Sequence, residues 1–239
     1  MQDQLFCFLD VLGFSNLVEN EALDSIHAKY EKLIAAANQQ QHNGLVFSSW
    51  AGHPYFSYEV LESAYFSDTI VFWCPYDVRF LQSLALSMKE VLCQSIEVGL
   101  PLRGAISVGQ AILNKEKNEF IGRPVVSATK AEKVQCWIGI TLSSDFREPP
   151  FNGGFSADCF IPYELHLKED GLQRVTPLVL DFPRRWRGTR QSSLQSAVSA
   201  LDRKPEFSIY YKNTLDFVEF SHKSERWWET HPDFKNRDT

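Results

Sequence analysis

The sequence predicts an α+β domain in which helices pack on a mostly antiparallel sheet. Short apolar runs rich in β-branched and aromatic residues predict strands, and longer segments with apolar residues at helical spacing predict helices between them. The expected order is strand, helix, hairpin, helix, strand, helix, strand, which is typical of a sheet covered by helices. The chain has 239 residues, of which 44% are hydrophobic, so it can bury a core of its own.

The first elements surround an unusual acid. Residues 5–11 form an apolar run interrupted only by Asp10, and they predict a buried strand. A turn at residues 12–15 follows, and apolar side chains at helical spacing over residues 17–37 predict a helix. Residues 63–73 carry strong strand formers on both sides of a Ser-Asp pair, which predicts a hairpin or two strand pieces.

The middle of the chain has clear boundaries. Residues 80–98 predict an amphipathic helix that ends at Gly99, because Pro101 prevents its continuation. A strand rich in small residues is expected over residues 102–111. The next expected elements are a hairpin tip at residues 114–118, a helix at residues 124–134 and a strand at residues 137–142.

The character of the sequence changes at Asp145, where proline- and glycine-rich stretches begin. We therefore expect a core at residues 1–146 and a C-terminal extension at residues 147–239 that packs on the same domain. The basic run at residues 184–187 is expected to be a solvated surface loop or a phosphate contact. The other elements expected there are a strand at residues 176–182, a helix at residues 192–203 that a serine caps, and a helix or strand-helix pair at residues 208–220.

Charge and composition exclude several classes of protein. The formal net charge of −6 argues against a nucleic-acid or membrane-surface binder, although local cations can still hold a small anionic substrate. Five scattered cysteines without CxxC spacing are expected to be reduced and mostly buried, with a zinc site as the alternative. Neither a signal peptide nor an apolar run of roughly 20 residues is found, so we expect a cytoplasmic protein.

Two acids at strand ends are the strongest candidates for chemistry. Asp10 ends one apolar strand, and Asp68 lies between Phe66 and the strand that begins near Ile70. Burying an unpaired carboxylate costs several kcal/mol, so each acid should be paired or bound to a metal ion. On adjacent strands they would bind one or two Mg²⁺ or Mn²⁺ ions. The alternative is structural: Asp10 caps a turn and Asp68 serves a tight hairpin.

Five segments of the chain form a series of motifs at residues 8–15, 66–69, 102–109, 120–125 and 137–140. In this order they resemble the motifs of class III nucleotidyl cyclases. The resemblance implies a sandwich with a ferredoxin-like core and two Mn²⁺ or Mg²⁺ ions per site, held by Asp10, Asp68 and the Val11 carbonyl. It also implies a head-to-tail homodimer, in which one chain supplies the acids and the other supplies Lys130.

Two departures narrow the resemblance. Val126 and Lys130 stand where purine cyclases carry asparagine and arginine, and Ala64-Tyr65 replaces a lysine ahead of the second acid. These features resemble the bacterial Pycsar pyrimidine cyclases. That family implies conversion of UTP or CTP to a 3′,5′-cyclic nucleotide during phage infection, and of the two products we expect cyclic UMP. It also implies a separate effector that the cyclic nucleotide activates, without direct contact between effector and cyclase. The residues do not distinguish UTP from CTP.

The resemblance also suggests roles in substrate binding. Leu12, Gly13, Phe14 and Ser15 would hold the triphosphate through backbone N–H groups, or else form a plain structural turn. Tyr65 is a candidate for reading the base, or a core aromatic with its hydroxyl at the surface.

Three charged residues are further candidates for the site. Glu119 would read the base or be a solvated charge in the hairpin. Lys130 would stabilise charge on the α-phosphate or lie on a solvated helix face. Arg103 would contact substrate or form a buried structural pair.

Two rival hypotheses remain at the level of sequence. One is a purine cyclase or a related nucleotidyl transferase. The other is a degenerate cyclase domain that binds nucleotide and signals by dimer rearrangement. Val126 and Lys130 favour the degenerate domain, whereas the presence of both acids speaks against it.

Overall fold

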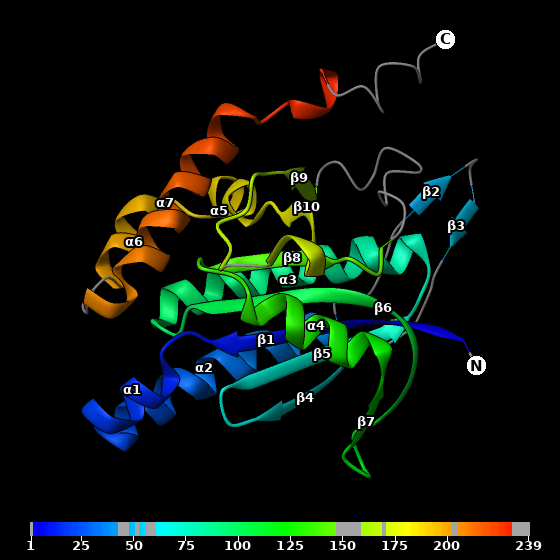
Figure 1. The fold of residues 1–239 in the computed structure, drawn as a ribbon, viewed down its shortest axis with the longest axis horizontal. Helices are drawn as coiled ribbons and strands as arrows, with labels where there is room; N and C mark the ends of the chain where they lie inside the picture. The colour runs from blue at the N-terminus through cyan, green and yellow to red at the C-terminus, as the bar shows by residue number, and fades with distance from the viewer. Residues whose placement is uncertain are drawn as a thin grey trace.

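The computed structural model describes residues 2–42, 48–50, 53–55, 61–146, 159–168, 171–201 and 205–230, and it confirms the α+β class (Figure 1). Within these ranges eight strands form one sheet in the order β4-β5-β1-β6-β8-β10-β9, with β7 paired to β6. Neighbouring strands run antiparallel except β6 and β8, which are parallel. The strands of the sheet are β1 (Asp3–Val11), β4 (Glu62–Phe66), β5 (Thr69–Pro75), β6 (Leu102–Asn114), β7 (Glu119–Gly122), β8 (Gly139–Ser143), β9 (Phe160–Pro162) and β10 (Val175–Leu180).

Helices cover both faces of this sheet. Figure 1 shows α4 in front of the sheet and α2 and α3 behind it, with α5, α6 and α7 grouped beyond β8 and β10. A short ribbon of β2 (Ser48–Trp50) and β3 (His53–Tyr55) lies apart. The helices are α1 (Phe14–Asn20), α2 (Leu23–His42), α3 (Val78–Val98), α4 (Arg123–Lys133), α5 (Phe182–Thr189), α6 (Leu194–Leu201) and α7 (Ser208–Lys223), with 3₁₀ turns η2 (Gly171–Arg174), η3 (Pro205–Phe207) and η4 (Trp227–Glu229).

The central strand β1 is apolar from Leu5 to Leu9 because both of its faces are covered there. Leu5 and Leu9 point into the cluster formed with α2 and α3. Phe6 and Phe8 point to the other face, where they pack near Ala128 of α4. Strand alternation therefore places the side chain of Asp10 on the α4 face.

The helix predicted over residues 17–37 is two helices. Gly13 precedes the first with a left-handed backbone (φ 74°), and α1 begins at Phe14. Glu21 is extended (φ −113°, ψ 156°), so the chain leaves α1 and re-enters helix at Leu23. Periodicity extends across this break because apolar side chains of α1 and α2, such as Leu17 and Tyr30, pack against the same core.

The C-terminal region contains elements that local patterns did not predict, namely β9 and α5. The expectation of a surface loop at residues 184–187 is wrong, because this run lies in α5 with Trp186 only 2% exposed. Asp181 caps the helix by accepting a bond from the Arg184 N–H at 3.2 Å. Glu90 of α3 forms ion pairs with Arg185 of α5 at 2.8 Å and with Arg190, the residue after α5, at 2.6 Å.

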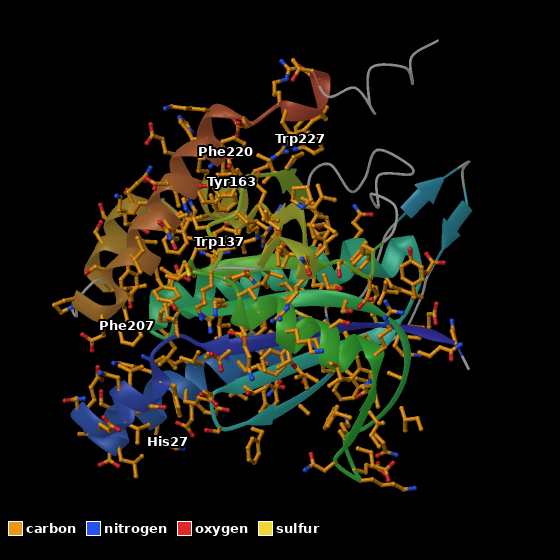
Figure 2. The ribbon with its side chains drawn as sticks, in the orientation of Figure 1. His27, Trp137, Tyr163, Phe207, Phe220 and Trp227 are labelled. Atoms are coloured by element: carbon orange, nitrogen blue, oxygen red, sulfur yellow. The ribbon has the colours of Figure 1, made fainter. Side chains whose placement is uncertain are left out.

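Aromatic contacts join α7 to the rest of the molecule (Figure 2). The Trp137 ring, which follows α4, lies 4.7 Å from Phe217 on α7, centroid to centroid. Tyr163 lies 4.8 Å from Phe220 and 6.1 Å from Trp137. Much of the described extension therefore shares one core with the first half of the chain.

The five cysteines are free thiols, and all but Cys136 are buried. Burial raises the pKa values of Cys7 and Cys93, so these thiols stay protonated at neutral pH. No helix within the described ranges combines the length and the apolar character that a membrane span requires.

Candidate active site

Asp10 and Asp68 come together at one end of the sheet. Asp10 is the penultimate residue of β1, and it pairs with Thr69 at the start of β5. Asp68 precedes Thr69 in the turn of the β4–β5 hairpin, where Ser67 adopts a left-handed backbone (φ 53°). The Val11 N–H donates to the Asp68 carbonyl at 3.0 Å, which ties the hairpin turn to the end of β1.

The charge of Asp10 is strongly perturbed by its surroundings. Its side chain is 26% exposed. Burial raises the pKa of Asp10 to about 6, and the negative charges of Glu132 and Asp68 add to that rise. Arg103 and Lys133 oppose it. The influence of Asp68 on Asp10 shows that the two carboxylates lie near enough to repel each other, which a shared cation would relieve.

Arg103 lies in a buried ion pair beside Asp10. Its Nε donates to Glu132 Oε1 at 2.6 Å, and its Nη1 donates to the Gln135 carbonyl at 3.0 Å. Its Nη2 lies 3.8 Å from Asp10 Oδ2, and the guanidinium carbon lies 5.7 Å from the centre of the Tyr210 ring. Nη2 also contacts Glu132 Oε1, so Arg103 and Glu132 form a buried ion pair whose cation lies beside Asp10.

The turn after β1 leads directly into α1. Gly13 is the N-cap of this helix, and the first N–H groups of a helix, here those of Phe14 and Ser15, have no acceptor within the helix. The N–H of Leu12 is different, because it donates to the Pro101 carbonyl at 2.9 Å. The left-handed backbone at Gly13 (φ 74°) favours glycine, and a Cβ there would make a tight contact of 3.1 Å with the Phe207 ring.

Three other predicted residues lie on β4, β7 and α4. Tyr65 packs against the α2–α3 core, and its hydroxyl donates to Asn38 at 2.5 Å, whereas Asp10 faces α4. Glu119 is partly exposed in β7, opposite Asn114 of the β6–β7 hairpin. Lys130 is exposed on α4.

Three residues near the site were not predicted from the sequence. Glu132 and Lys133 are charges that act on Asp10, and Tyr210 is a partner of Arg103. Glu132 is 2% exposed and lies on the buried side of α4 with Ala128. An acid on the apolar side of an amphipathic helix is a signal that could have identified it. Tyr210 gives no such signal, because its contact with Arg103 depends on how α7 packs.

A cavity of about 420 Å³ lies behind the turn, between α1, the end of α3, α6 and Phe207. Leu12 and Gly13 line it, but Asp10 and Asp68 are not among its lining residues. The cavity is therefore not the place where the two carboxylates meet.

The donor set suits a hard divalent cation. Within the described ranges no group of three or more His, Cys, Asp or Glu side chains is arranged to hold a metal ion. Two carboxylates and the Val11 carbonyl supply oxygen ligands only, which Mg²⁺ and Mn²⁺ prefer, and Mg²⁺ sites typically take their other ligands from water and substrate phosphates. The residues present therefore fit metal ions that bind together with a phosphorylated substrate.

Comparison with known proteins identifies the fold. No protein-family model and no curated protein matches the sequence. The structure is similar to the dimeric guanylyl cyclase domain of the RhoGC fusion protein from the aquatic fungus Blastocladiella emersonii, with a TM-score of 0.51 and 12% identity over 75% of this chain and 96% of that chain.

Two other solved structures resemble it to a similar degree. A monomeric double mutant of the same fungal domain gives a TM-score of 0.53 and 13% identity over 75% of this chain and 94% of the other. The catalytic core of a rhodopsin-guanylyl cyclase with converted specificity, in complex with ATPαS, gives 0.51 and 11% over 74% and 93%. The protein therefore has the fold of class III nucleotidyl cyclase domains.

Proposed function

We propose that this protein is a metal-dependent nucleotide cyclase that converts UTP to 3′,5′-cyclic UMP and pyrophosphate. The observation that carries the proposal is the meeting of Asp10 and Asp68 at one end of a cyclase fold, beside the Gly13 turn that leads into α1. In this proposal the product is a second messenger in cytoplasmic antiphage defence, and it acts on a separate effector.

In the proposed reaction the ribose 3′-oxygen bonds to the α-phosphorus while the bond from that phosphorus to the bridging oxygen of pyrophosphate breaks. The proton of the 3′-hydroxyl passes to solvent. Asp10, Asp68 and the Val11 carbonyl would hold two Mn²⁺ or Mg²⁺ ions, which would supply Lewis acidity for the phosphoryl transfer. Backbone N–H groups of Gly13, Phe14 and Ser15 would orient the phosphates.

The preference for a pyrimidine rests on the sequence resemblance. Val126 replaces the ribose-binding asparagine of purine cyclases, and Tyr65 follows Ala64 where their lysine is expected. We keep Tyr65 and Glu119 as candidates for reading the base. CTP, ATP and GTP are the alternative substrates, and a nucleotide-binding module without turnover is the alternative function.

A product assay tests the proposal directly. The protein is incubated separately with each of the four ribonucleoside triphosphates and Mn²⁺, and the products are identified by mass spectrometry. We expect cyclic UMP from UTP, and none from an Asp68→Ala variant that retains the wild-type fold. Cyclic CMP, AMP or GMP as the main product would correct the substrate. The absence of any cyclic product, with nucleotide binding retained, would establish the non-enzymatic alternative.

We further propose that the active unit is a head-to-tail homodimer. Lys130 is exposed on α4, and Val126, four residues earlier on the same side of the helix, is 52% exposed. Phe66, two residues before Asp68, is 78% exposed. Apolar side chains exposed beside both halves of the site support a partner surface there, which would bring Lys130 of one chain to the carboxylates of the other.

Mixing two inactive variants tests this arrangement. In the proposed dimer each of the two sites needs Asp68 from one chain and Lys130 from the other. A homodimer of Asp68→Ala or of Lys130→Ala lacks one of these residues in both sites. If the halves come from different chains, a mixed dimer keeps one intact site, so equal mixing should restore about one quarter of the wild-type rate. If both residues act within one chain, the mixture stays inactive. The readout is pyrophosphate release after the variants are mixed and allowed to exchange subunits.

A further inference from the structure

The start of α7 and the η3 turn before it contact the candidate active site from the C-terminal extension. The Phe207 ring packs on Gly13, 3.1 Å from where a Cβ would stand. The neighbouring Glu206 accepts a hydrogen bond from Asn16 Nδ2 of α1 at 3.2 Å. Figure 2 shows Phe207 at the end of α7 nearest to α1. These contacts fix the turn that follows Asp10.

One helical turn further on, α7 contacts Arg103. The Tyr210 ring faces the guanidinium at 5.7 Å, a distance at which a cation and an aromatic ring attract each other. Glu132 Oε1 contacts both Nε and Nη2 of the guanidinium, and the Gln135 carbonyl accepts from Nη1. Nη2 also lies 3.8 Å from Asp10 Oδ2. The ring therefore limits how far Arg103 can move relative to Asp10.

The same helix also fixes the segment from which the Gln135 carbonyl reaches Arg103. Asn213 Nδ2 donates to the Cys136 carbonyl at 2.7 Å, and the Ile138 N–H donates to Thr214 Oγ1 at 2.9 Å. Both α7 side chains are buried. Arg103 is thus held by α7 directly through an aromatic ring and indirectly through the chain after Gln135.

We infer that the first two turns of α7, with η3, are a positioning element of the catalytic centre. In this inference Tyr210 holds Arg103 against Asp10, and Phe207 holds the Gly13 turn. The inference rests on the proposed function, because it concerns the same carboxylates. It assigns the C-terminal extension a part in the chemistry in addition to its part in the core. Tyr210 acts through Arg103 and is not itself expected to touch substrate.

Substitutions at Tyr210 test the inference. Tyr210→Leu keeps apolar bulk but removes the ring, and Tyr210→Phe keeps the ring but removes the hydroxyl. We expect Tyr210→Leu to lower kcat for the cyclised nucleotide and to weaken Mn²⁺ binding, each by about 3- to 30-fold, the range that corresponds to a cation–π contact. KM for the nucleotide should change little. Tyr210→Phe should match the wild-type protein.

Phe220→Leu is the matched control, because it removes an aromatic ring from the far end of α7, where Phe220 packs on Tyr163. All assays are run well below the lowest melting temperature of the set, and Mn²⁺ binding is measured by titration calorimetry. The inference is overturned if Tyr210→Leu matches the wild-type protein, if Tyr210→Phe is as impaired as Tyr210→Leu, or if Phe220→Leu has the same effect as Tyr210→Leu. A wild-type protein that cyclises no nucleotide would contradict the proposed function instead, and Mn²⁺ affinity would still decide the role of Tyr210.

Discussion

Asp10→Asn is expected to abolish turnover and at the same time to stabilise the metal-free protein at neutral pH. Loss of the carboxylate removes a proposed metal ligand. Loss of a side chain that only supports such a ligand lowers activity by up to about 100-fold, so loss of the ligand itself should lower turnover by more than that. The gain in stability follows from the raised pKa of Asp10, because a charged carboxylate at this place is unfavourable next to Glu132 and Asp68.

The raised pKa of Asp10 makes the stability of the protein depend on pH. The pKa of Asp10 is about 6 in the folded protein, against 3.8 for an unperturbed group. Between these values the folded state binds the proton more tightly than the unfolded state, so the contribution of Asp10 to stability falls as pH rises. Above about pH 6 both states are ionised and the penalty is fully present. Asparagine carries no charge, so the variant should lack this decline.

Thermal melts of both proteins in chelator from pH 4 to pH 8 provide the measurement. The melting temperature of Asp10→Asn should exceed that of the wild-type protein above pH 6, and added Mn²⁺ should raise only that of the wild-type protein. Asp3→Asn is the control, because it removes an exposed carboxylate from the other end of the same strand. An Asp10→Asn variant that is less stable than the wild-type protein in chelator at pH 7, or that Mn²⁺ stabilises equally, would contradict the assignment of Asp10.

Glu132→Ala is expected to lower the free energy of unfolding by about 3–5 kcal/mol, the usual cost of removing one partner of a buried ion pair. Arg103 is 8% exposed and Glu132 is 2% exposed, so water cannot readily replace the lost carboxylate. The loss of stability is partly offset because the substitution also removes the repulsion between Glu132 and Asp10. Unfolding in urea, followed by circular dichroism, measures the change.

Two further variants define the origin of this effect. Glu132→Gln keeps an acceptor for Arg103 and should lose less stability than Glu132→Ala. Glu219→Ala removes the acid of the exposed Lys223–Glu219 pair on α7 and should leave the unfolding free energy nearly unchanged. Equal losses in Glu132→Ala and Glu219→Ala would show that the Arg103–Glu132 pair is not effectively buried.

Local patterns were sufficient for the class of fold and for the two acids. Apolar runs and helical spacing predicted β1, β5, α3, β6, α4 and β8 with boundaries shifted by a few residues, because these elements bury faces whose period is visible in the sequence. They did not predict the break between α1 and α2 or the β2–β3 ribbon. Asp10 and Asp68 could be singled out because each interrupts such a run. Hydrogen bonding along the backbone then places them on adjacent strands.

Local patterns failed where segments owe their structure to distant partners. The Arg184–Arg187 segment has too little apolar character to predict a helix, yet it forms α5 because Trp186 enters the core and arginines at its end reach Glu90 of α3. In the same way, no pattern shows that the Tyr65 hydroxyl bonds Asn38.

The sequence by itself determined the order of the elements, the class of fold and the carboxylate pair, since these depend on periodicity and on the cost of burying charge. Only the tertiary structure decided what surrounds that pair. Arg103, Glu132 and Tyr210 come from three elements far apart along the chain, and they meet because the sheet and the helices pack in one particular way. Contacts between side chains of different elements depend on that packing, which no local pattern encodes.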